Sequence, residues 1–216
     1  VLLKNNGALP VNREGEGITL WGLNSINPTL GGMIGSSVAV DSDNGQIAYS
    51  LQMALEEKQF QLNQTMLKLY ESDAVNGKYG REGGHCSQPS FGMTYENTKT
   101  YKVGEAPASV YTDEALESAD ETAAVVVLSR DSSEATDYNP DMISQDESDS
   151  FEHPLALSEN EKAMIELAKE HSTKVIVLIN ADNPMELGDL EKDEEIDAIL
   201  WVGEPGMNGF LGVADI

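Results

Sequence analysis

The sequence predicts an α/β protein, an open and mainly parallel sheet sandwiched by helices in three layers. Residues 123–128, 174–180 and 197–203 are short, mostly apolar runs without polar alternation, which is typical of strands covered on both faces. Helical patterns separate these runs, and such alternation favours parallel strands joined by crossover helices. With 216 residues, 40% of them hydrophobic, the chain suffices for one sandwich domain over residues 1–216.

The first third of the chain mixes strand, loop and helix signals. Residues 1–10 read as an apolar segment and a turn, and residues 18–22 as a short strand that ends in glycine. Residues 24–37 are rich in Gly, Asn, Ser and Pro, so we expect a loop. Within residues 46–58 the apolar positions recur at offsets of four, seven and eight, which predicts one buried helical face. Residues 60–70 predict a short strand and then a helix.

The second half gives clearer signals for its elements. Residues 113–121 predict a short acidic helix before the central strand. Ser158 and Glu161 have the spacing of a capping box, and an apolar helical stripe follows them and ends near His171. Residues 185–190 predict a short helix or turn between the last two strands.

Two stretches lack periodicity and are predicted to be loops. Residues 75–108 are rich in Gly, Ser, Asn and Tyr, and we expect a loop-rich insertion there. Residues 139–154 hold five carboxylates, so we expect an acidic, mobile and solvated loop without chemistry of its own.

Composition excludes several classes of partner. A formal net charge of −25 argues against nucleic acid and against an anionic membrane. A single cysteine, Cys86, excludes an internal disulfide and fits a reducing compartment, which favours a bacterial-type cytoplasm over export. No apolar run approaches the roughly 20 residues of a membrane-spanning helix. The chain starts without methionine and stops without a closing element, so we expect a piece of a longer protein.

Three motif-like stretches do not support a cofactor or a metal ion. Gly31–Ser37 lacks the Lys-Ser/Thr and the glycine spacing of phosphate-binding loops. Asp41–Gly45 resembles the start of a calcium loop, but the glycine comes one position early and Gln52 stands at position twelve. The adjacent pair His85–Cys86 lacks the spacing of metal ligands. We therefore expect neither a metal site nor a cofactor.

The strongest site candidate follows the central strand. After residues 123–128 the chain turns polar and carries Glu134 and Asp137 just past the carboxyl end of that strand. In open α/β sheets, ligands bind at this edge. We interpret Glu134 as one half of a catalytic pair whose other half lies outside this chain.

Several motifs in the same order resemble glycoside hydrolase family 3. Residues 1–10, VLLKNNGALP, resemble the opening of the second domain of that family. Gly31–Ser37 resembles its Gly-Gly-x-Gly-Ser-Gly loop, with one extra residue and serine in place of the last glycine. Residues 126–137 resemble its Val-Val-x-Ser-Arg-x-Ser-Gly-Glu-Gly-x-Asp-Arg segment. The strands and turns that follow match residues 155–161, 175–187 and 198–209.

This resemblance implies an α/β sandwich that works beside a catalytic (β/α)8-type barrel. In much of the family the barrel supplies an aspartate nucleophile and the sandwich a glutamate acid/base, and Glu134 is the matching position. Arg130, Ser133 and Asp137 are then expected to contact the substrate. Asp137 can either supply the negative charge that raises the pKa of the acid or be a solvated loop residue. Since the acid/base position varies between subgroups, Glu105 is a second candidate.

Three positions depart from the family pattern. Ser133 and Ala135 stand where glycines are usual, and Tyr138 stands where arginine is frequent. The first two changes stiffen the segment around Glu134, and the third removes a possible contact to a sugar or a carboxylate.

Two functions follow from the resemblance. The first is a hydrolase part: the sandwich domain of a retaining, exo-acting β-glycosidase of carbohydrate metabolism, with a β-glucosidase expected and the isolated chain inactive. The alternative is a non-catalytic carbohydrate-binding or scaffold domain of the same family. A nucleotide-binding module is disfavoured by the missing phosphate-loop motifs and the acidic charge.

Overall fold

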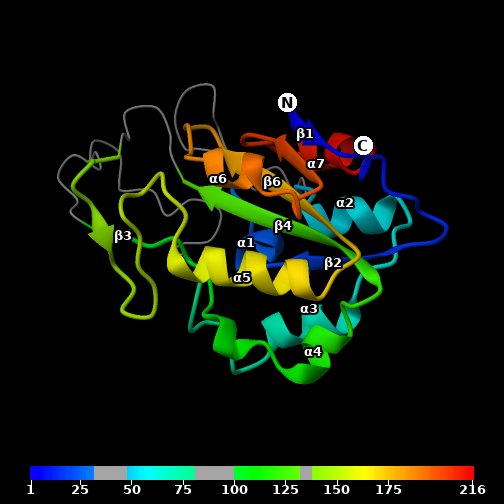
Figure 1. Cartoon of the computed structure of the whole chain (residues 1–216), viewed down its shortest axis with the longest axis horizontal. Helices are drawn as coiled ribbons and strands as arrows, with labels where there is room; N and C mark the ends of the chain where they lie inside the picture. Colours follow the sequence, from blue (N-terminus) through cyan, green and yellow to red (C-terminus); the bar gives the residue numbers. More distant parts are fainter. Residues whose placement is uncertain (32–47, 81–99, 132–137) are drawn as a thin grey trace.

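The computed structural model describes residues 1–31, 48–80, 100–131 and 138–216. A five-stranded main sheet lies between two layers of helices, which confirms the predicted α/β sandwich (Figure 1). Across the sheet the strands follow the order β1 (Leu2–Asn5), β7 (Ala198–Trp201), β6 (Lys174–Ala181), β4 (Thr122–Arg130) and β2 (Gly17–Trp21). All neighbours are parallel except β1, which runs antiparallel to β7 at one edge.

Strand β4 is an inner strand of this sheet, next to the edge strand β2, and is covered on both faces. It pairs with β2 on one side and with β6 on the other, from Ala123 opposite Lys174 to Arg130 opposite Ala181. Its side chains alternate between the two cores: Val125 packs into one of them and Leu128 into the other. This alternation confirms that the unbroken apolar run is a doubly buried strand.

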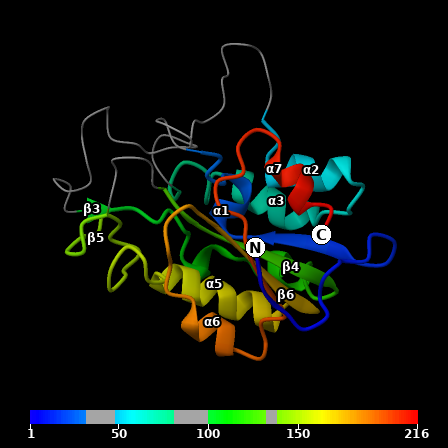
Figure 2. The same ribbon diagram turned by 90° about the horizontal axis from the view of Figure 1, so that it is seen from above.

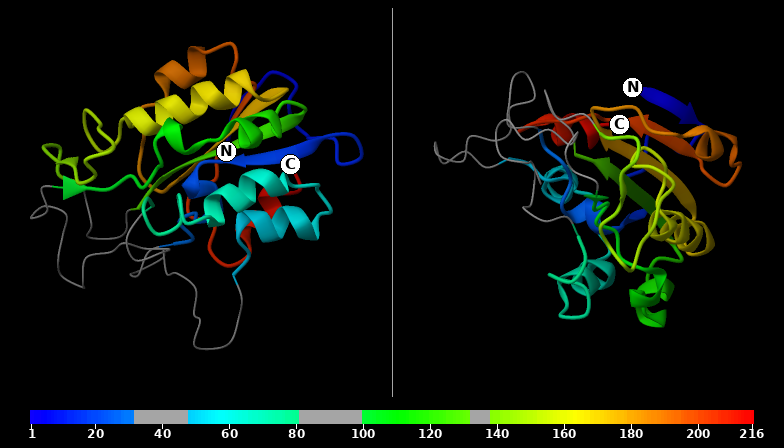
Figure 3. Two further views of the ribbon diagram at one scale, coloured as in Figure 1. Left: turned by 90° about the horizontal axis from the view of Figure 1, so that it is seen from below. Right: turned by 90° about the vertical axis from the view of Figure 1, so that its left-hand side faces the viewer.

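The helices form one layer on each face. One layer contains α4 (Asp113–Glu117), α5 (Glu159–Glu170) and α6 (Gly188–Lys192), and the other contains α2 (Leu51–Glu57) and α7 (Gly209–Val213). Helix α3 (Gln64–Glu71) lies by the β2 edge and contributes residues to both cores. Figure 2 shows α5 and α6 across the sheet from α2 and α7, and both panels of Figure 3 show the same layering.

Helix α5 forms as its sequence predicts. The Ser158 side chain accepts a hydrogen bond from the Glu161 N–H, and the Glu161 carboxylate accepts one from the Ser158 N–H, so the capping box is confirmed. Met164 and Ala168 form part of the buried stripe of this helix. The helix ends at His171, whose Nδ1 lies 2.8 Å from Asp120 Oδ1.

A second, much smaller sheet stands apart from the main one. Strands β3 (Thr100–Tyr101) and β5 (Ile143–Ser144) pair in parallel, and Figure 1 shows β3 on the side toward which the β4 arrow points. A small apolar group packs around this pair; we call it the satellite cluster, and it consists of Tyr101, Val103, Met142, Tyr138 and Phe151.

Besides β3 and β5, which lie in stretches predicted to be loops, further short elements were not predicted. They are the edge strand β1, the four-residue helix α1 (Leu23–Ile26) and helix α7. Residues 139–154 are also less solvated than expected, because β5, the buried Met142 and the nearly buried Asp149 belong to them. Within the described part of the chain, no helix combines the length and apolarity that crossing a membrane requires. The motifs Asp41–Gly45 and His85–Cys86 lie outside the described residues.

Candidate functional site

The carboxyl edge of the main sheet is tied together by the side chain of Asn180. Its Oδ1 accepts hydrogen bonds from Thr29 N–H at 2.7 Å and from the Ser129 hydroxyl at 2.8 Å. Its Nδ2 donates to the carbonyls of Thr29 at 2.8 Å and Gly203 at 2.7 Å. One amide therefore joins the ends of β4 and β6 to the segments that follow α1 and β7.

Asp131, the residue after β4, forms hydrogen bonds through its carboxylate, its backbone N–H and its backbone carbonyl. Its carboxylate Oδ1 accepts a 2.5 Å hydrogen bond from the Thr29 hydroxyl. Its N–H donates to the Tyr101 hydroxyl at 3.0 Å, and its carbonyl accepts a hydrogen bond from the Tyr138 hydroxyl. Because Thr29 belongs to the main sheet edge and both tyrosines to the satellite cluster, Asp131 connects the two regions.

The predicted catalytic and binding residues Glu134, Ser133 and Asp137 lie outside the described residues. The residues that flank them in the chain, Asp131 and Tyr138, are described and are joined by the hydrogen bond from the Tyr138 hydroxyl. The roles predicted for the three residues between them stay predictions.

Arg130 is fully buried and its five N–H groups are all used within the chain. Its guanidinium makes a two-point contact with the Glu161 carboxylate at 2.7 and 2.8 Å. The remaining N–H groups donate to the carbonyls of Ser129, Pro154 and Ala156. These contacts give Arg130 the structural role of locking the end of β4 to the start of α5, and its predicted substrate contact stays a prediction.

Glu105, the second candidate for the acid/base, is also fully buried. Its carboxylate accepts hydrogen bonds from Leu23 N–H at 3.1 Å and from Ala106 N–H at 2.9 Å. Burial raises the pKa of Glu105 to about 8, an effect partly opposed by these two hydrogen bonds. The carboxyl can hold a proton near neutral pH, but with no exposed surface it cannot reach a glycosidic oxygen in this conformation.

The close packing around Glu105 requires glycine at position 22. Gly22 has a φ of 86°, in the left-handed region that favours glycine. A Cβ at this position would lie 2.5 Å from Glu105 Oε2 and 2.5 Å from Met164 Sδ. The glycine that ends the first predicted strand therefore lets the chain turn against a buried carboxyl.

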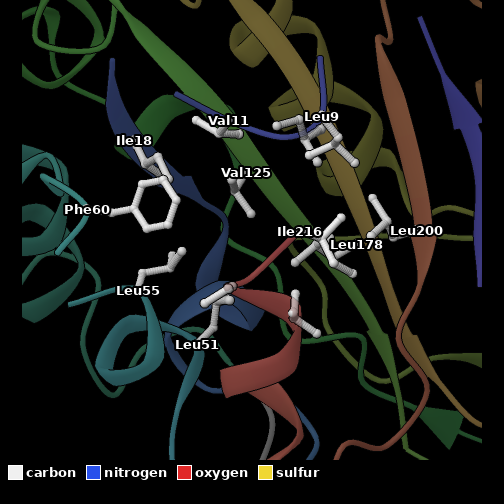
Figure 4. A pocket seen from close by; sticks show the side chains of 13 residues that line it. Leu9, Val11, Ile18, Leu51, Leu55, Phe60, Val125, Leu178, Leu200 and Ile216 are labelled. Atoms are coloured by element: carbon white, nitrogen blue, oxygen red, sulfur yellow. The ribbon is translucent and has the colours of Figure 1, made fainter. Parts of the chain in front are cut away.

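Two pockets lie away from Asp131 and Tyr138. A pocket of about 340 Å³ is formed by α1, α3 and the turns beside them, at the lower end of the size range of small-molecule sites. Its lining includes Asn24, Asn76 and Tyr79. A second cavity, of about 40 Å³, lies in the core that contains α2 and α7 and is lined by apolar side chains such as Phe60 and Leu178 (Figure 4). We regard it as an imperfectly filled part of that core.

Sequence reasoning missed most of the residues that organise this edge. The sequence could have indicated a role for Asn180, because a polar residue ends a buried strand at the edge where ligands bind. Tyr101 gave none, since it lies in a stretch without periodicity. Among the described residues, no group of three His, Cys, Asp or Glu side chains is arranged to hold a metal ion.

Comparison with known proteins identifies the family. The family model described as the glycosyl hydrolase family 3 C-terminal domain matches residues 1–216. β-Glucosidase 3B of Thermotoga neapolitana, solved with glycerol, matches with a TM-score of 0.70 and 23% identity, over 100% of this chain and 26% of that protein. A β-glucosidase of Paenibacillus barengoltzii matches with a TM-score of 0.68 and 26% identity, over 100% of this chain and 21% of that protein.

A more distant β-glucosidase of Listeria innocua, a variant solved with laminaribiose, has a TM-score of 0.59 and 15% identity, over 100% of this chain and 22% of that protein. No curated protein sequence matches the chain. The chain spans only 26% and 21% of the first two β-glucosidases. Since the family model matches from the first residue to the last and the same sandwich occurs in these enzymes, this chain belongs to the glycosyl hydrolase family 3 C-terminal domain family.

Proposed function

We propose that this chain is the sandwich domain of a retaining, exo-acting β-glycosidase that hydrolyses O-glycosidic bonds. In this proposal a barrel domain of the same polypeptide supplies an aspartate nucleophile, and Glu134 supplies the acid/base. The three solved relatives described above are β-glucosidases, which supports β-glucosides as the substrate class.

The observation that carries the proposal is the environment of the two residues that flank the Glu134 segment. Strand β4 ends at Arg130 beside the end of β6, at the carboxyl edge of the sheet where ligands bind in this class of fold. Asp131 and Tyr138 are hydrogen-bonded to one another at that edge. These two described residues precede and follow the segment that contains Glu134 in the chain, and their position at that edge supports the proposal.

The chemistry explains why a second domain is part of the proposal. A retaining glycosidase uses two carboxyl groups about 5 to 5.5 Å apart, one as nucleophile and one as acid and then base. The acid must carry a proton when it meets the glycosidic oxygen, so its pKa has to be raised by burial or by nearby negative charge. Such surroundings require the sandwich and the barrel together, and the separate chain is expected to be inactive.

The test uses the complete enzyme, as wild type and as Glu134→Ala, on aryl β-glucosides with poor and with activated leaving groups. Loss of the acid should lower kcat/KM by about 100-fold or more on poor leaving groups and leave it nearly unchanged on activated ones. Azide should restore turnover of the activated substrate, because a small anion can replace the missing base. Glu147→Ala, at an exposed glutamate of the acidic segment, is the matched control and should behave as wild type.

The rival function, a carbohydrate-binding or scaffold domain, is favoured by the departures at Ser133, Ala135 and Tyr138 from the family pattern. It predicts that Glu134→Ala retains wild-type activity on both kinds of substrate. That result would remove Glu134 from the reaction, and protonation would then be assigned to a residue of the barrel.

A further inference from the structure

We propose that the pocket of about 340 Å³ beside α1 and α3 binds one neutral sugar ring, and we call it the α1 pocket. Three segments line it: α1 with the residue that follows, the end of α3 with the turns after it, and Gly104. All of these residues belong to the described part of the chain. Binding at this pocket goes beyond the proposed function, since it requires neither an acid/base nor a barrel domain.

The α1 pocket lies beside the carboxyl end of β2. This strand ends at Trp21, Gly22 makes the turn, and α1 begins at Leu23. Because β2 runs parallel to β4, its end belongs to the carboxyl edge of the main sheet. Ligands of open α/β sheets bind at that edge. The pocket therefore occupies a position at which the fold favours a ligand.

One buried amide that lines the α1 pocket is unpaired. Asn24 is 2% exposed, and its Nδ2 makes no hydrogen bond to any of the described residues. The fully buried Asn180, by contrast, uses both ends of its amide in hydrogen bonds. A buried donor without a partner is unfavourable, and a ligand that accepts from it removes that cost. Asn24 therefore indicates that an acceptor oxygen belongs in the pocket.

The wall of the α1 pocket is fixed by hydrogen bonds within the chain. The Tyr70 hydroxyl accepts a hydrogen bond from Gly22 N–H at 2.8 Å and donates one to the Leu20 carbonyl at 3.3 Å. The Leu23 N–H donates to both oxygens of the Glu105 carboxylate at 3.1 Å. These contacts hold the Tyr70 ring and the start of α1 in place. A ligand that binds there therefore has to order little of the chain.

The polar part of the lining selects a neutral ligand with hydroxyl groups. It consists of amides and a carboxylate, from Asn24, Asn27, Asn76 and Glu71, and the described lining contains no lysine, arginine or histidine. Without a cation the pocket cannot neutralise a phosphate or a carboxylate, and the exposed Glu71 repels either one. Amide and carboxylate groups together both donate to and accept from hydroxyls. A polyhydroxylated, uncharged molecule fits this set.

The apolar part of the lining narrows the ligand to a sugar ring. Leu23, Ile26 and Val75 contribute aliphatic surface, and Tyr70 and Tyr79 contribute aromatic rings. A pyranose carries hydroxyls around its rim and C–H groups on its faces, so it matches a pocket that combines amides with apolar surface. The volume is at the lower end for small-molecule sites, which favours a single ring. A purely apolar ligand would leave the buried amide unpaired.

The test is a titration of this chain with D-glucose, followed residue by residue in NMR spectra. We expect saturable shifts of the Asn76 and Gly77 backbone amides and of the Asn24 side-chain amide. The Kd should be about 1 to 10 mM, as expected for a ligand of about 12 non-hydrogen atoms. Glucose 6-phosphate should bind at least about tenfold more weakly, because its charge finds no cation in the pocket.

Two variants of the lining and one control locate the binding. Asn24→Leu removes the unpaired donor and should weaken D-glucose binding by about tenfold or more. Its melting temperature should stay within about 2 °C of wild type, because the lost Nδ2 group makes no hydrogen bond in the fold. Asn76→Ala, at the exposed rim, should weaken binding by about threefold. Asn208→Ala changes an exposed asparagine outside the pocket, without a side-chain capping bond, and should bind as wild type.

Weaker binding in both pocket variants, with an unchanged Kd in Asn208→Ala, supports the sugar site. The proposal is overturned if D-glucose causes no saturable shifts up to about 100 mM, or if all variants bind it equally. Equal binding of glucose 6-phosphate would overturn the selection of a neutral ligand. If Asn24→Leu does not fold, Asn76→Ala decides alone, because its side chain is exposed. Each of these results leaves the proposed function untouched, since that concerns hydrolysis by the complete enzyme.

Discussion

Two edge-to-face tyrosine pairs cross at similar angles but lie in very different surroundings. Tyr70 and Tyr111 cross at 89° with both side chains buried, and Trp21 packs against Tyr111 with ring centroids 5.5 Å apart. Tyr101 and Tyr138 cross at 83°, but Tyr138 is only partly buried. The first pair belongs to the core between sheet and helices, and the second belongs to the satellite cluster.

This comparison indicates that the main core and the satellite cluster differ in how much they contribute to the stability of the fold. The main core is continuous along the sheet, so the loss of one contact there is felt by the whole fold. The satellite cluster has three buried side chains and two partly buried ones on a two-stranded sheet. Regions with so few buried contacts open locally at a lower free energy than global unfolding requires. We therefore expect the satellite cluster to be the less stable of the two regions.

The largest effect is expected where β4 is locked to α5. Glu161→Gln keeps the shape of the side chain but leaves the buried Arg130 guanidinium without its carboxylate. Removing one partner of a buried ion pair costs about 3 to 5 kcal/mol, so the free energy of unfolding should fall by that amount in urea titrations of this chain. Glu159→Gln is the control, because its pair with Lys162 is exposed and contributes less than about 1 kcal/mol. Equal losses in the two variants would contradict the role of the Arg130–Glu161 pair in locking β4 to α5.

A pair of truncations tests the comparison directly. Leu128→Ala removes a fully buried side chain of β4 and should cost about 3 kcal/mol in the free energy of unfolding. Met142→Ala, at a side chain that is 2% exposed in the satellite cluster, should cost about 2 kcal/mol, at the low end for a buried methionine, because few neighbours surround the cavity. Hydrogen exchange should then show faster exchange of the β3 and β5 amides in Met142→Ala and unchanged protection in β4. Loss of protection throughout the sheet would show that the two regions unfold as one.

The last test concerns the pH dependence caused by Glu105, which lies in the chain between Val103 of the satellite cluster and Ala106 of the main core. Its pKa is about 8 in the folded chain against an ordinary value of 4.5, so the folded state binds this proton more tightly than the unfolded state. The stability that the protonated carboxyl contributes is fully present below pH 4.5 and is lost as the pH rises through about 8. The slope is at most about 1.4 kcal/mol per pH unit. Glu105→Gln should flatten the pH dependence of the melting temperature in this window, whereas an unchanged slope would show that other groups cause it.

The sequence predicted the parts of the fold whose signals are local. The doubly covered strand at 123–128 and the capping box of Ser158 and Glu161 follow from patterns a few residues long, and both are present. The short edge strand β1 was not predicted, because its mostly exposed residues pair with β7, almost 200 residues further along the chain. Contacts of this kind depend on the finished sheet and leave no local pattern.

The site divides in the same way. A polar run after a buried strand predicted a site at the carboxyl edge of the sheet, and the role of Glu134 there stays a proposal. The hydrogen bond between Asp131 and Tyr101 could not be predicted, because the two residues are thirty positions apart in the chain and their contact depends on two separate elements. Arg130 was expected to contact the substrate from the resemblance alone. Only the structure shows that its side chain is buried and paired with Glu161.

The separation of the satellite cluster from the main sheet also has a meaning for evolution. The residues around β3 and β5 contribute little to the core, so mutations there can accumulate without unfolding the domain. The inner strands of the main sheet tolerate far fewer substitutions, since side chains pack on both faces of β4. Natural variation can therefore reshape the satellite cluster while the architecture of the main sheet is inherited unchanged, so related domains can differ at this end without a new fold.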